Sequence, residues 1–396
     1  MRILQICNKP PFPAVDGGAI AMNNVTHGLI SKGCTVNVLT ITTQKHKIST
    51  LPKSYIDKTK FQSVFIDTTI KAKDAFFNLF SKKSYNVERF ISDDFSKKLA
   101  EILKEEDTFD FIIIESLFVT PYIETIKKHT KAKIILRAHN VEHKIWERIS
   151  ANTNNIVKKK YIDLLAKRMK NYEISIFNKL DAICAMTNVD VESFKELGFK
   201  KNIASIPTGY ILDELKIVKK PVDDFSVFHL ASMDWLPNTE GVDWFIKNVW
   251  SNVNKTVPKA HLFLAGREMP QSYYELNNKS ITTIGPVKSA KEFFLSKHIM
   301  VVPILSGSGM RIKIIEGMAI GKVIIATTIG AEGINCTNNK NILIADSPKA
   351  FSAAIIKCLN DKSFCEEISK NAKALIIEQY SNESISSKMM EFFKQL

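Results

Sequence analysis

The chain has 396 residues, of which 45% are hydrophobic, and a formal net charge of +14. This length fits two domains better than one, and the apolar fraction is enough to bury two cores. The chain contains no run of about 18 apolar residues, which argues against a membrane-spanning helix. Its six cysteines are scattered without a Cys-x-x-Cys pair or a His-rich cluster. We therefore expect reduced thiols in a cytoplasmic protein, with neither a disulfide framework nor a bound metal.

The positive charge is concentrated in the first half. Residues 1–205 contain 33 Lys and Arg against 22 Asp and Glu, whereas the rest of the chain contains 22 against 19. A basic half favours a polyanionic neighbour, such as a membrane surface, a nucleic acid or an anionic substrate. No recognised nucleic-acid module is present, so we expect no nucleic-acid partner. The alternative explanation of the charge is an AT-rich genome, which can raise the lysine content of a protein.

Buried strands alternate with helical patterns along the first 210 residues. The first apolar run reads as a strand and not as a signal peptide. A helix closed by Gly33 is predicted at 19–32, and the polar segment 45–59 predicts a loop. Strands are predicted at 3–6, 36–42, 111–114, 134–136 and 182–185. This alternation predicts a parallel sheet covered by helices on both faces.

A second alternation follows residues 205–222, whose two prolines and one glycine mark a domain boundary. The predicted fold class is therefore α/β, with two Rossmann-like doubly wound domains facing a cleft. We expect an N-terminal domain at 1–205, a C-terminal domain at 206–380, and a C-terminal helix at 381–396 that packs back towards the N-terminal domain. Strands of the second domain are predicted at 226–230, 261–265, 281–284, 299–302, 323–326 and 342–344.

The most informative motif is GSGMRIKIIE at 307–316. A predicted strand, a Gly-rich turn around Gly309 and Met310, and a helix start follow one another there. Free backbone N–H groups and the positive end of the helix dipole converge at such a point, which suits a phosphate group. Arg311 and Lys313 add positive charge, and Glu316 adds a carboxylate. The motif predicts a site for a nucleoside diphosphate attached to a hydroxylated group.

Further polar residues follow the predicted strands, where an open α/β sheet binds ligands. Each also has a plainer reading: a tight turn for the paired glycines, a surface ion pair with Glu268 for Arg267, and an ordinary loop for the histidines. A metal pair of His139 and His143 lacks a third ligand. The candidates are Gly17, Gly18, Glu115, His139, Asn140, Arg267 and Glu332.

These motifs resemble the family 4 glycosyltransferases, which have the GT-B architecture. The resemblance spans nearly the whole chain and rests on RAHNVEH, IPTGY, ASMDWLPN, LAGRE and GSGMRIKIIEGMAIGK. The wording is similar to that of bacterial enzymes that build capsule, exopolysaccharide or lipopolysaccharide. It implies metal-independent, retaining transfer of a sugar from a nucleotide-sugar donor on the C-terminal domain to a glycan or lipid-linked acceptor, at the cytoplasmic face of the membrane and with no cofactor.

The resemblance also implies roles for individual residues. Glu316 matches the acidic residue that binds the ribose hydroxyls, and His139 matches the histidine that contacts the transferred sugar; both are the expected catalytic residues. Glu115 and Asn140 are expected on the acceptor side. The expected donor-binding residues are Gly17, Gly18, Arg267, Gly309, Met310, Arg311, Lys313, Glu316 and Glu332.

The sequence departs from the family pattern at two places. Family members often have a glutamate eight residues before Glu316, where this chain has Ser308. They also commonly carry a basic residue in the loop that here reads Ser232-Met233-Asp234-Trp235. Two other functions stay open at this point: a nucleotide-sugar 2-epimerase, disfavoured by Ser308, and a non-catalytic nucleotide-sugar-binding subunit.

The segment 71–90 interleaves phenylalanines with lysines. This pattern is compatible with an amphipathic element that lies on an anionic membrane surface. The same pattern also fits a surface helix whose aromatic side packs on its own domain, and the sequence slightly favours this second interpretation.

Overall fold

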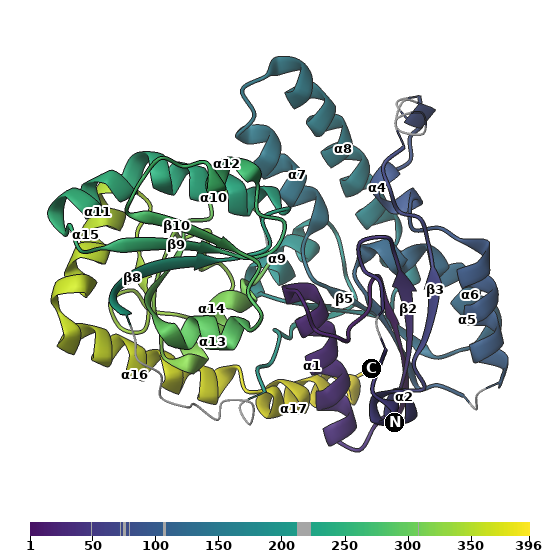
Figure 1. The fold of residues 1–396 in the computed structure, drawn as a ribbon. Helices are drawn as coiled ribbons and strands as arrows, with labels where there is room; N and C mark the ends of the chain where they lie inside the picture. The colour runs from purple at the N-terminus through teal and green to yellow at the C-terminus, as the bar shows by residue number, and fades with distance from the viewer. Residues whose placement is uncertain are drawn as a thin grey trace. The chain divides into compact units, whose positions relative to one another are not determined.

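The computed structural model describes residues 1–48, 50–71, 73, 77–78, 80–105, 108–211, 223–307 and 309–396. The chain divides into two compact units, each with its own parallel sheet (Figure 1). Unit 1 comprises Met1–Gly209 and Asn382–Leu396, and unit 2 comprises Tyr210–Ser381. The two doubly wound sheets confirm the predicted fold class.

Seven parallel strands form the sheet of unit 1, in the spatial order β3-β2-β1-β4-β5-β6-β7. The order reverses between β1 and β4, which makes this the switch point of the sheet, where the loops after the two strands diverge and leave room for a ligand. The strands are β1 (Arg2–Cys7), β2 (Thr35–Thr42), β3 (Gln62–Phe65), β4 (Phe111–Glu115), β5 (Lys133–Ala138), β6 (Ala182–Ala185) and β7 (Asn202–Ser205).

Helices cover both faces of this sheet, because successive strand residues point to opposite sides. In β1, Leu4 and Ile6 join one core, whereas Ile3 and Cys7 join the other. The helices are α1 (Gly17–Ser31), α2 (Lys53–Thr59), α4 (Tyr85–Glu88), α5 (Asp93–Glu105), α6 (Ile123–His129), α7 (Glu142–Ala151), α8 (Ile156–Ser175), α9 (Asn188–Glu196) and α17 (Asn382–Phe393), with 3-10 turns at Leu117–Tyr122 and Phe177–Lys179.

The C-terminal helix α17 belongs to unit 1 and packs against α1 (Figure 1). Phe393 stacks on Phe111 with ring centroids 4.7 Å apart. A Cβ atom on Gly28 of α1 would lie 2.9 Å from the hydroxyl of Ser386, so the glycine permits the close helix contact. The last residues of the chain thus complete the core of unit 1.

One helix and two edge strands of unit 1 depart from the sequence prediction. Helix α2 occupies part of the segment 45–59, for which a loop is predicted, and that prediction is wrong. Only Tyr55 and Thr59 of α2 are buried, and Tyr55 stacks on Phe12 at 4.8 Å, so tertiary packing rather than a periodic pattern fixes the helix. Strands β3 and β7 are short and only partly buried, which leaves no apolar run to read.

The sheet of unit 2 has six parallel strands in the order β10-β9-β8-β11-β12-β13, with its switch point between β8 and β11. The strands are β8 (Asp223–Leu230), β9 (His261–Ala265), β10 (Ile281–Gly285), β11 (Lys297–Val302), β12 (Val323–Ala326) and β13 (Leu343–Ile344). The helices are α10 (Leu236–Phe245), a π-helical turn at Ile246–Trp250, α11 (Ser251–Thr256), α12 (Gln271–Tyr274), α13 (Ala290–Ser296), α14 (Ile312–Ile320), α15 (Pro348–Asn360) and α16 (Lys362–Gln379).

Helix α10 passes very close to the end of β11. A Cβ atom on Gly241 would lie 2.2 Å from the carbonyl oxygen of Pro303, so only glycine fits there. This contact fixes α10 beside the loop that follows β11. None of the helices within the described ranges is long and apolar enough to cross a membrane.

Candidate active site

The candidate residues gather at the carboxyl ends of the strands in each unit. In unit 1, Gly17 and Gly18 open α1 after β1, Glu115 ends β4, and His139 follows β5. In unit 2, Arg267 follows β9, and the loop after β11 leads into α14. Strands β1 and β4, and likewise β8 and β11, flank the switch points at which such sheets bind ligands.

An ion pair between Lys9 and Asp16 stabilises the turn before α1, and its lysine lies close to Gly18. Asp16 caps α1 by accepting a hydrogen bond from the Ala19 amide at 2.9 Å, and the Lys9 ammonium lies 2.7 Å from the same carboxylate oxygen. Burial opposes the ionisation of Asp16, but hydrogen bonds from His46, Lys9 and Ala19 outweigh it and lower the pKa of this carboxyl. A Cβ atom on Gly18 would lie 2.9 Å from the Lys9 ammonium, so the glycine leaves room for the end of the lysine side chain.

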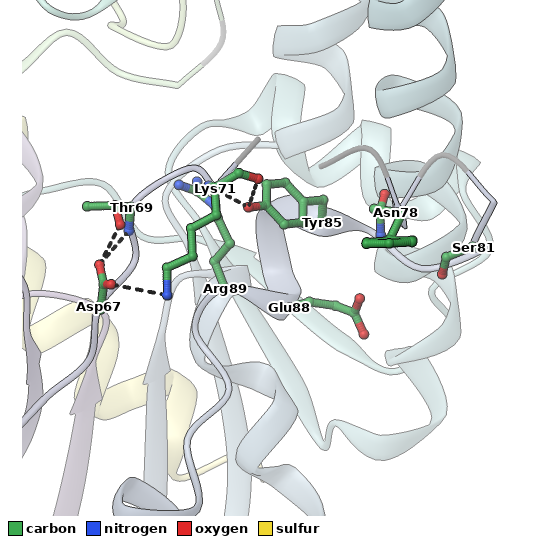
Figure 2. A pocket seen from close by; sticks show the side chains of 9 residues that line it. Asp67, Thr69, Lys71, Asn78, Ser81, Tyr85, Glu88 and Arg89 are labelled. Atoms are coloured by element: carbon green, nitrogen blue, oxygen red, sulfur yellow. Dashed lines mark hydrogen bonds and ion pairs between the residues drawn. The ribbon is translucent and has the colours of Figure 1, made fainter. Parts of the chain in front are cut away.

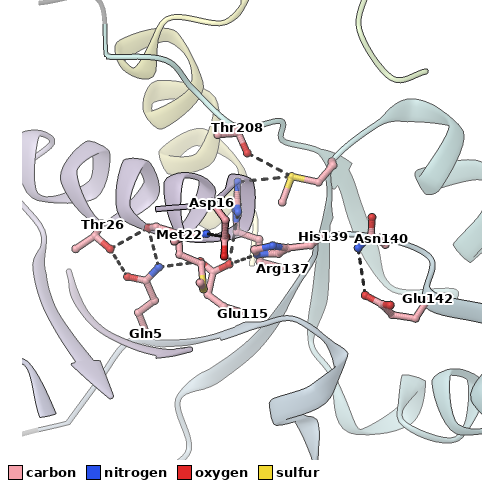
Figure 3. Close-up of polar contacts among 12 residues, drawn as sticks. Gln5, Asp16, Met22, Thr26, Glu115, Arg137, His139, Asn140, Glu142 and Thr208 are labelled. Atoms are coloured by element: carbon pink, nitrogen blue, oxygen red, sulfur yellow. Dashed lines mark hydrogen bonds and ion pairs between the residues drawn. The ribbon is translucent and has the colours of Figure 1, made fainter. Parts of the chain in front are cut away.

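His139 belongs to a buried polar network that Figure 3 shows. Its Nε2 lies 2.6 Å from Oε2 of Glu115, which is fully buried. Arg137, also fully buried, lies 3.5 Å from the same oxygen. Gln5 donates a hydrogen bond of 2.8 Å to the other carboxylate oxygen of Glu115 and accepts one of 2.6 Å from Thr26. The network joins β1, α1, β4 and β5 at the switch point of unit 1.

The charges of this network fix the protonation of His139. Burial opposes the ionisation of Glu115, but the charge of Arg137 and the hydrogen bond from His139 outweigh it and lower the pKa of Glu115. Burial lowers the pKa of His139 against the opposing effect of Glu115. An ionised Glu115 only accepts hydrogen bonds, so Nε2 of a neutral His139 carries the proton and Nδ1 is an acceptor.

The loop after β5 holds a second group of buried ionisable residues. Asn140 donates to Glu142 at 3.2 Å, so it turns toward its own helix. Glu173 of α8 accepts hydrogen bonds from the backbone N–H groups of Glu142 and His143 and thereby caps α7. Nδ1 of His143 lies 2.5 Å from Glu173, which gives this histidine a structural partner. Burial, with the nearby charge of Glu173, raises the pKa of Glu142 to about 8.

The phosphate motif of unit 2 has the geometry that the sequence predicts around α14. Gly309 has a φ of +81°, a conformation that favours glycine, and Met310 beside it is half-buried. Arg311 is the residue before α14, and its side chain does not cap the helix. Its guanidinium donates to the carbonyl oxygen of Gly309 and lies 5.4 Å from the ring of Trp235. The Ile314 amide donates to the Arg311 carbonyl at 2.9 Å, whereas the amides of Ile312 and Lys313 have no acceptor within the described residues and can bind an anion.

Lys313 lies one residue inside α14. Its ammonium donates to Oδ1 of Asn238 at 2.9 Å, and no ion pair of Lys313 exists within the described ranges. Burial, with the nearby charge of Arg311, lowers the pKa of Lys313 to about 7. An anion bound at the start of α14 would therefore lie near an ammonium that has no carboxylate partner within the described residues. Asn238 lies in the first turn of α10, whose N-cap is Trp235.

The remaining candidates of unit 2 lie on three different elements of the chain. Glu316 is half-buried on α14, and its spacing from Lys313 puts the two on the same helix face. Arg267 is half-buried in the loop after β9, where its carbonyl oxygen accepts from the Met233 amide at 2.9 Å. Glu332 is half-buried in the loop after β12. Ser308 lies outside the described residues.

Two buried polar residues near these sites belong to no motif in the sequence. Gln5 of β1 donates to Glu115, and Nδ1 of His229 in β8 lies 2.9 Å from the Val301 carbonyl. Burial, with the charge of Lys313, lowers the pKa of His229 far below its usual value. The only signal for such residues is a polar residue inside an apolar strand. No three His, Cys, Asp or Glu side chains in the described part of the chain converge to hold a metal ion.

The chain is similar to known proteins in sequence and in fold. Residues 224–361 match the family model described as glycosyl transferases group 1. An uncharacterized 44.6 kDa protein in the cps region of Klebsiella pneumoniae is 23% identical over 402 residues, which cover 98% of this chain and 99% of that protein.

Solved structures share the fold over the whole chain. Sucrose-phosphate synthase from Thermosynechococcus elongatus superposes with a TM-score of 0.72 and 14% identity, covering 100% of this chain and 99% of that one. TarM superposes with a TM-score of 0.70 and 13% identity, covering 99% and 98%. HepE of Anabaena in complex with UDP and glucose gives 0.67 and 11%, covering 99% of both chains.

The two doubly wound sheets and these structural relatives define the class, which is a protein of the GT-B fold. Within this fold, residues 224–361 of unit 2 are similar to the group 1 glycosyl transferases.

Proposed function

We propose that this protein is a glycosyltransferase that moves a sugar from a nucleoside diphosphate donor to a glycan or lipid-linked acceptor during surface polysaccharide synthesis. The observation that carries the donor assignment is the candidate anion site at the start of α14, where Lys313 has an amide partner but, among the described residues, no carboxylate. The name of the Klebsiella relative refers to a cps region, which supports polysaccharide synthesis. Structural relatives were solved with UDP, UDP-glucose or GlcNAc, which supports a nucleotide-sugar donor.

The donor diphosphate is assigned to unit 2. The free amides at the start of α14 and the Lys313 ammonium neutralise the charge that builds up on the leaving diphosphate. Arg311, Arg267 and the backbone around Gly309 and Met310 complete the cationic surroundings. Glu316 accepts hydrogen bonds from the ribose hydroxyls, and Glu332 lies in the neighbouring loop. A cationic protein site of this kind can perform the role that a metal ion performs in other transferases, so we propose metal-independent transfer.

The sugar and the acceptor are assigned to unit 1. His139, held by Glu115, contributes a neutral imidazole whose Nδ1 accepts a hydrogen bond from a sugar hydroxyl. Gly17 and Gly18 lie at the start of α1, where the backbone comes close to a bound ligand. We propose transfer with retention of the anomeric configuration, in which the acceptor hydroxyl attacks the anomeric carbon on the face from which the diphosphate leaves, and no protein nucleophile takes part. The acceptor is made at the cytoplasmic face of a membrane.

The test uses purified protein, a panel of UDP-, GDP- and ADP-sugars, and membrane extract as the acceptor source, with products detected by mass. One donor should lose its sugar to the extract, and Lys313→Ala should lower this rate by about 100-fold or more. Lys349→Ala, an exposed lysine of α15 in the same unit, is the matched control and should leave the rate unchanged.

Other outcomes separate the alternatives. A changed sugar in the donor without any acceptor would indicate an epimerase. Nucleotide-sugar binding without turnover against any extract would indicate a non-catalytic subunit. Either result would contradict the proposed transfer.

A further inference from the structure

Large apolar side chains are exposed around the segment that joins β3 to α5. Exposed aromatic and aliphatic groups in one place usually mark a binding surface. Three phenylalanines in the described part of the chain are more than half exposed, and all three lie here. The exposed fractions are 54% for Phe65, 71% for Ile70, 69% for Phe77, 81% for Phe80 and 52% for Ile91.

A polar pocket of about 420 Å³ lies among these side chains (Figure 2). Phe77 lines it together with Asp67, Lys71, Tyr85 and Arg89. The Tyr85 hydroxyl accepts a hydrogen bond of 3.1 Å from the Lys71 amide, which ties α4 to the end of the segment after β3. The pocket is therefore built by backbone and side-chain contacts within unit 1.

The charges in this pocket favour an anion. Asp67 already accepts hydrogen bonds from the Thr69 amide and hydroxyl, at 3.1 and 2.6 Å, and lies 3.4 Å from the Lys71 ammonium. Glu88, the other acidic residue of the lining, pairs at 2.8 Å with Lys83. Each carboxylate of the lining therefore already has a lysine partner, whereas Arg89 forms no ion pair within the described residues.

Arg89 has hydrogen-bonding capacity to spare. One terminal nitrogen donates to the Thr68 carbonyl at 2.6 Å, whereas its Nε is buried and has no hydrogen-bond partner among the described residues. A buried donor without a partner costs free energy that a bound oxygen would recover. Guanidinium groups bind phosphate oxygens with two parallel hydrogen bonds, so Arg89 suits a phosphate.

A second apolar tip lies in the same unit, at the start of α8. Ile156 and Val157 are 71% and 79% exposed, and Lys158, Lys159 and Lys160 follow them. Further along α8, Arg168 donates hydrogen bonds of 2.9 Å to the backbone and side-chain oxygens of Asn78, so the helix is joined to the pocket segment. The start of α8 lies at the top of Figure 1.

We infer that the pocket binds the phosphate of an anionic phospholipid headgroup, while Phe77, Phe80 and the start of α8 enter the surface of the membrane. Apolar side chains flanked by lysines are the composition of interfacial anchors. A soluble phosphate would give no reason for the exposed phenylalanines. This inference rests on the proposed function only for its purpose, because a lipid-linked acceptor has to be reached at a membrane.

The test is co-sedimentation of the full chain with phosphatidylcholine vesicles, with and without phosphatidylglycerol. Binding should require phosphatidylglycerol and weaken with salt. Lys71→Gln with Arg89→Gln should reduce binding by about tenfold or more, since each basic residue near an anionic surface contributes about fivefold. The matched control, Lys97→Gln with Lys104→Gln on α5, removes the same charge from exposed positions outside the pocket and should change binding less.

Phe77→Ser with Phe80→Ser tests the apolar part at two positions whose side chains are 69% and 81% exposed. It should reduce vesicle binding severalfold, whereas Ile377→Ser, at a 59% exposed position of unit 2, should not. Melting temperature and nucleotide binding, measured in parallel, should stay at their wild-type values. The inference is wrong if the pocket and phenylalanine variants bind vesicles like wild type. It is also wrong if inorganic phosphate binds the pocket but no vesicle does.

Failure of this inference differs from failure of the proposed function. Vesicle binding is measured without donor or acceptor, so an enzyme that transfers sugar but ignores anionic vesicles refutes the membrane site alone. A protein that binds the vesicles but turns over no nucleotide-sugar refutes only the proposed transfer.

Discussion

Replacement of Glu115 by Gln gives the most demanding prediction from the site of unit 1. Glu115 has no exposed surface and holds three donors, namely Gln5, Arg137 and His139. Glutamine keeps the volume but removes the negative charge. Arg137, which is equally buried and whose Nε has no hydrogen-bond partner in the described part of the chain, then keeps its charge without a counterion.

The expected loss of stability is large. Removing one partner of a buried ion pair costs about 3–5 kcal/mol, because the other charge stays buried and uncompensated. Glu115→Gln should therefore destabilise unit 1 by about this amount. Adding Arg137→Met removes the stranded charge, so the double variant should be more stable than Glu115→Gln alone. The single hydrogen bond from Gln5 contributes only about 1 kcal/mol and cannot account for such a difference.

The same substitution should change the tautomer of His139. With an ionised acceptor at Glu115, Nε2 carries the proton, whereas a glutamine can present its amide N–H and stabilise the Nδ1-protonated form. Nitrogen-15 NMR of the imidazole distinguishes the two tautomers. The stability change is read by hydrogen exchange of peptides from β4 and β5, which reports on unit 1 separately.

Two results would refute this reasoning. One is a Glu115→Gln protein whose β4 and β5 amides exchange as slowly as in the wild type. The other is a His139 that is protonated on Nδ1 in the wild-type protein, because Glu115 would then not be holding the ring as described.

Three further predictions concern single groups. The affinity for a nucleoside diphosphate should fall as pH rises through about 7, the pKa of Lys313, by at most tenfold per pH unit. Calorimetry should show that this pH dependence vanishes in Lys313→Arg, whose side chain stays charged. A pH dependence that persists in Lys313→Arg would contradict the prediction. Glu142 has a folded pKa of about 8, above its unfolded value, so between about pH 4.3 and 8 the folded state binds more protons and stability falls as pH rises. Melting temperatures of Glu142→Gln should fall less over this range than those of the wild type, and equal falls would refute the assignment. Gly33→Ala, at a φ of +81° with open space around the new Cβ, should lower the free energy of unfolding by about 1 kcal/mol. Gly266→Ala, whose Cβ would lie 1.6 Å from a carbonyl oxygen, should lower it by about 1–3 kcal/mol more, as measured by urea unfolding. Similar losses in the two variants would argue against the clash.

Much of the fold follows from the sequence because its strands are buried on both faces. Strands such as β4 and β11 are continuous apolar runs, and the loops between them carry clear turn signals. Strand β3 and helix α2 escape prediction because few of their side chains are buried, so their conformation depends on distant partners such as Phe12. Local pattern cannot encode such contacts.

The backbone around the candidate anion site follows from the sequence, because the apolar run of β11, the Gly-rich turn and the start of α14 can each be read from local pattern. The roles of Gly309, Lys313 and Glu316 in binding a ligand stay predictions. The support of His139 was not readable, because Gln5 comes from a strand more than a hundred residues away in sequence. Parallel pairing of β1 with β4 brings Gln5 to Glu115, and no local spacing records that pairing.

The account depends most on the anion site at the start of α14. Its most direct test is the melting temperature of the wild type and of Lys313→Ala with UDP, GDP or ADP, since a ligand that binds the folded state raises apparent stability. We predict that one of these nucleotides raises the melting temperature of the wild type, and that Lys313→Ala loses most of this rise while melting normally without ligand. A wild-type protein that no nucleotide stabilises, or a variant that is stabilised as strongly as the wild type, would contradict the assignment.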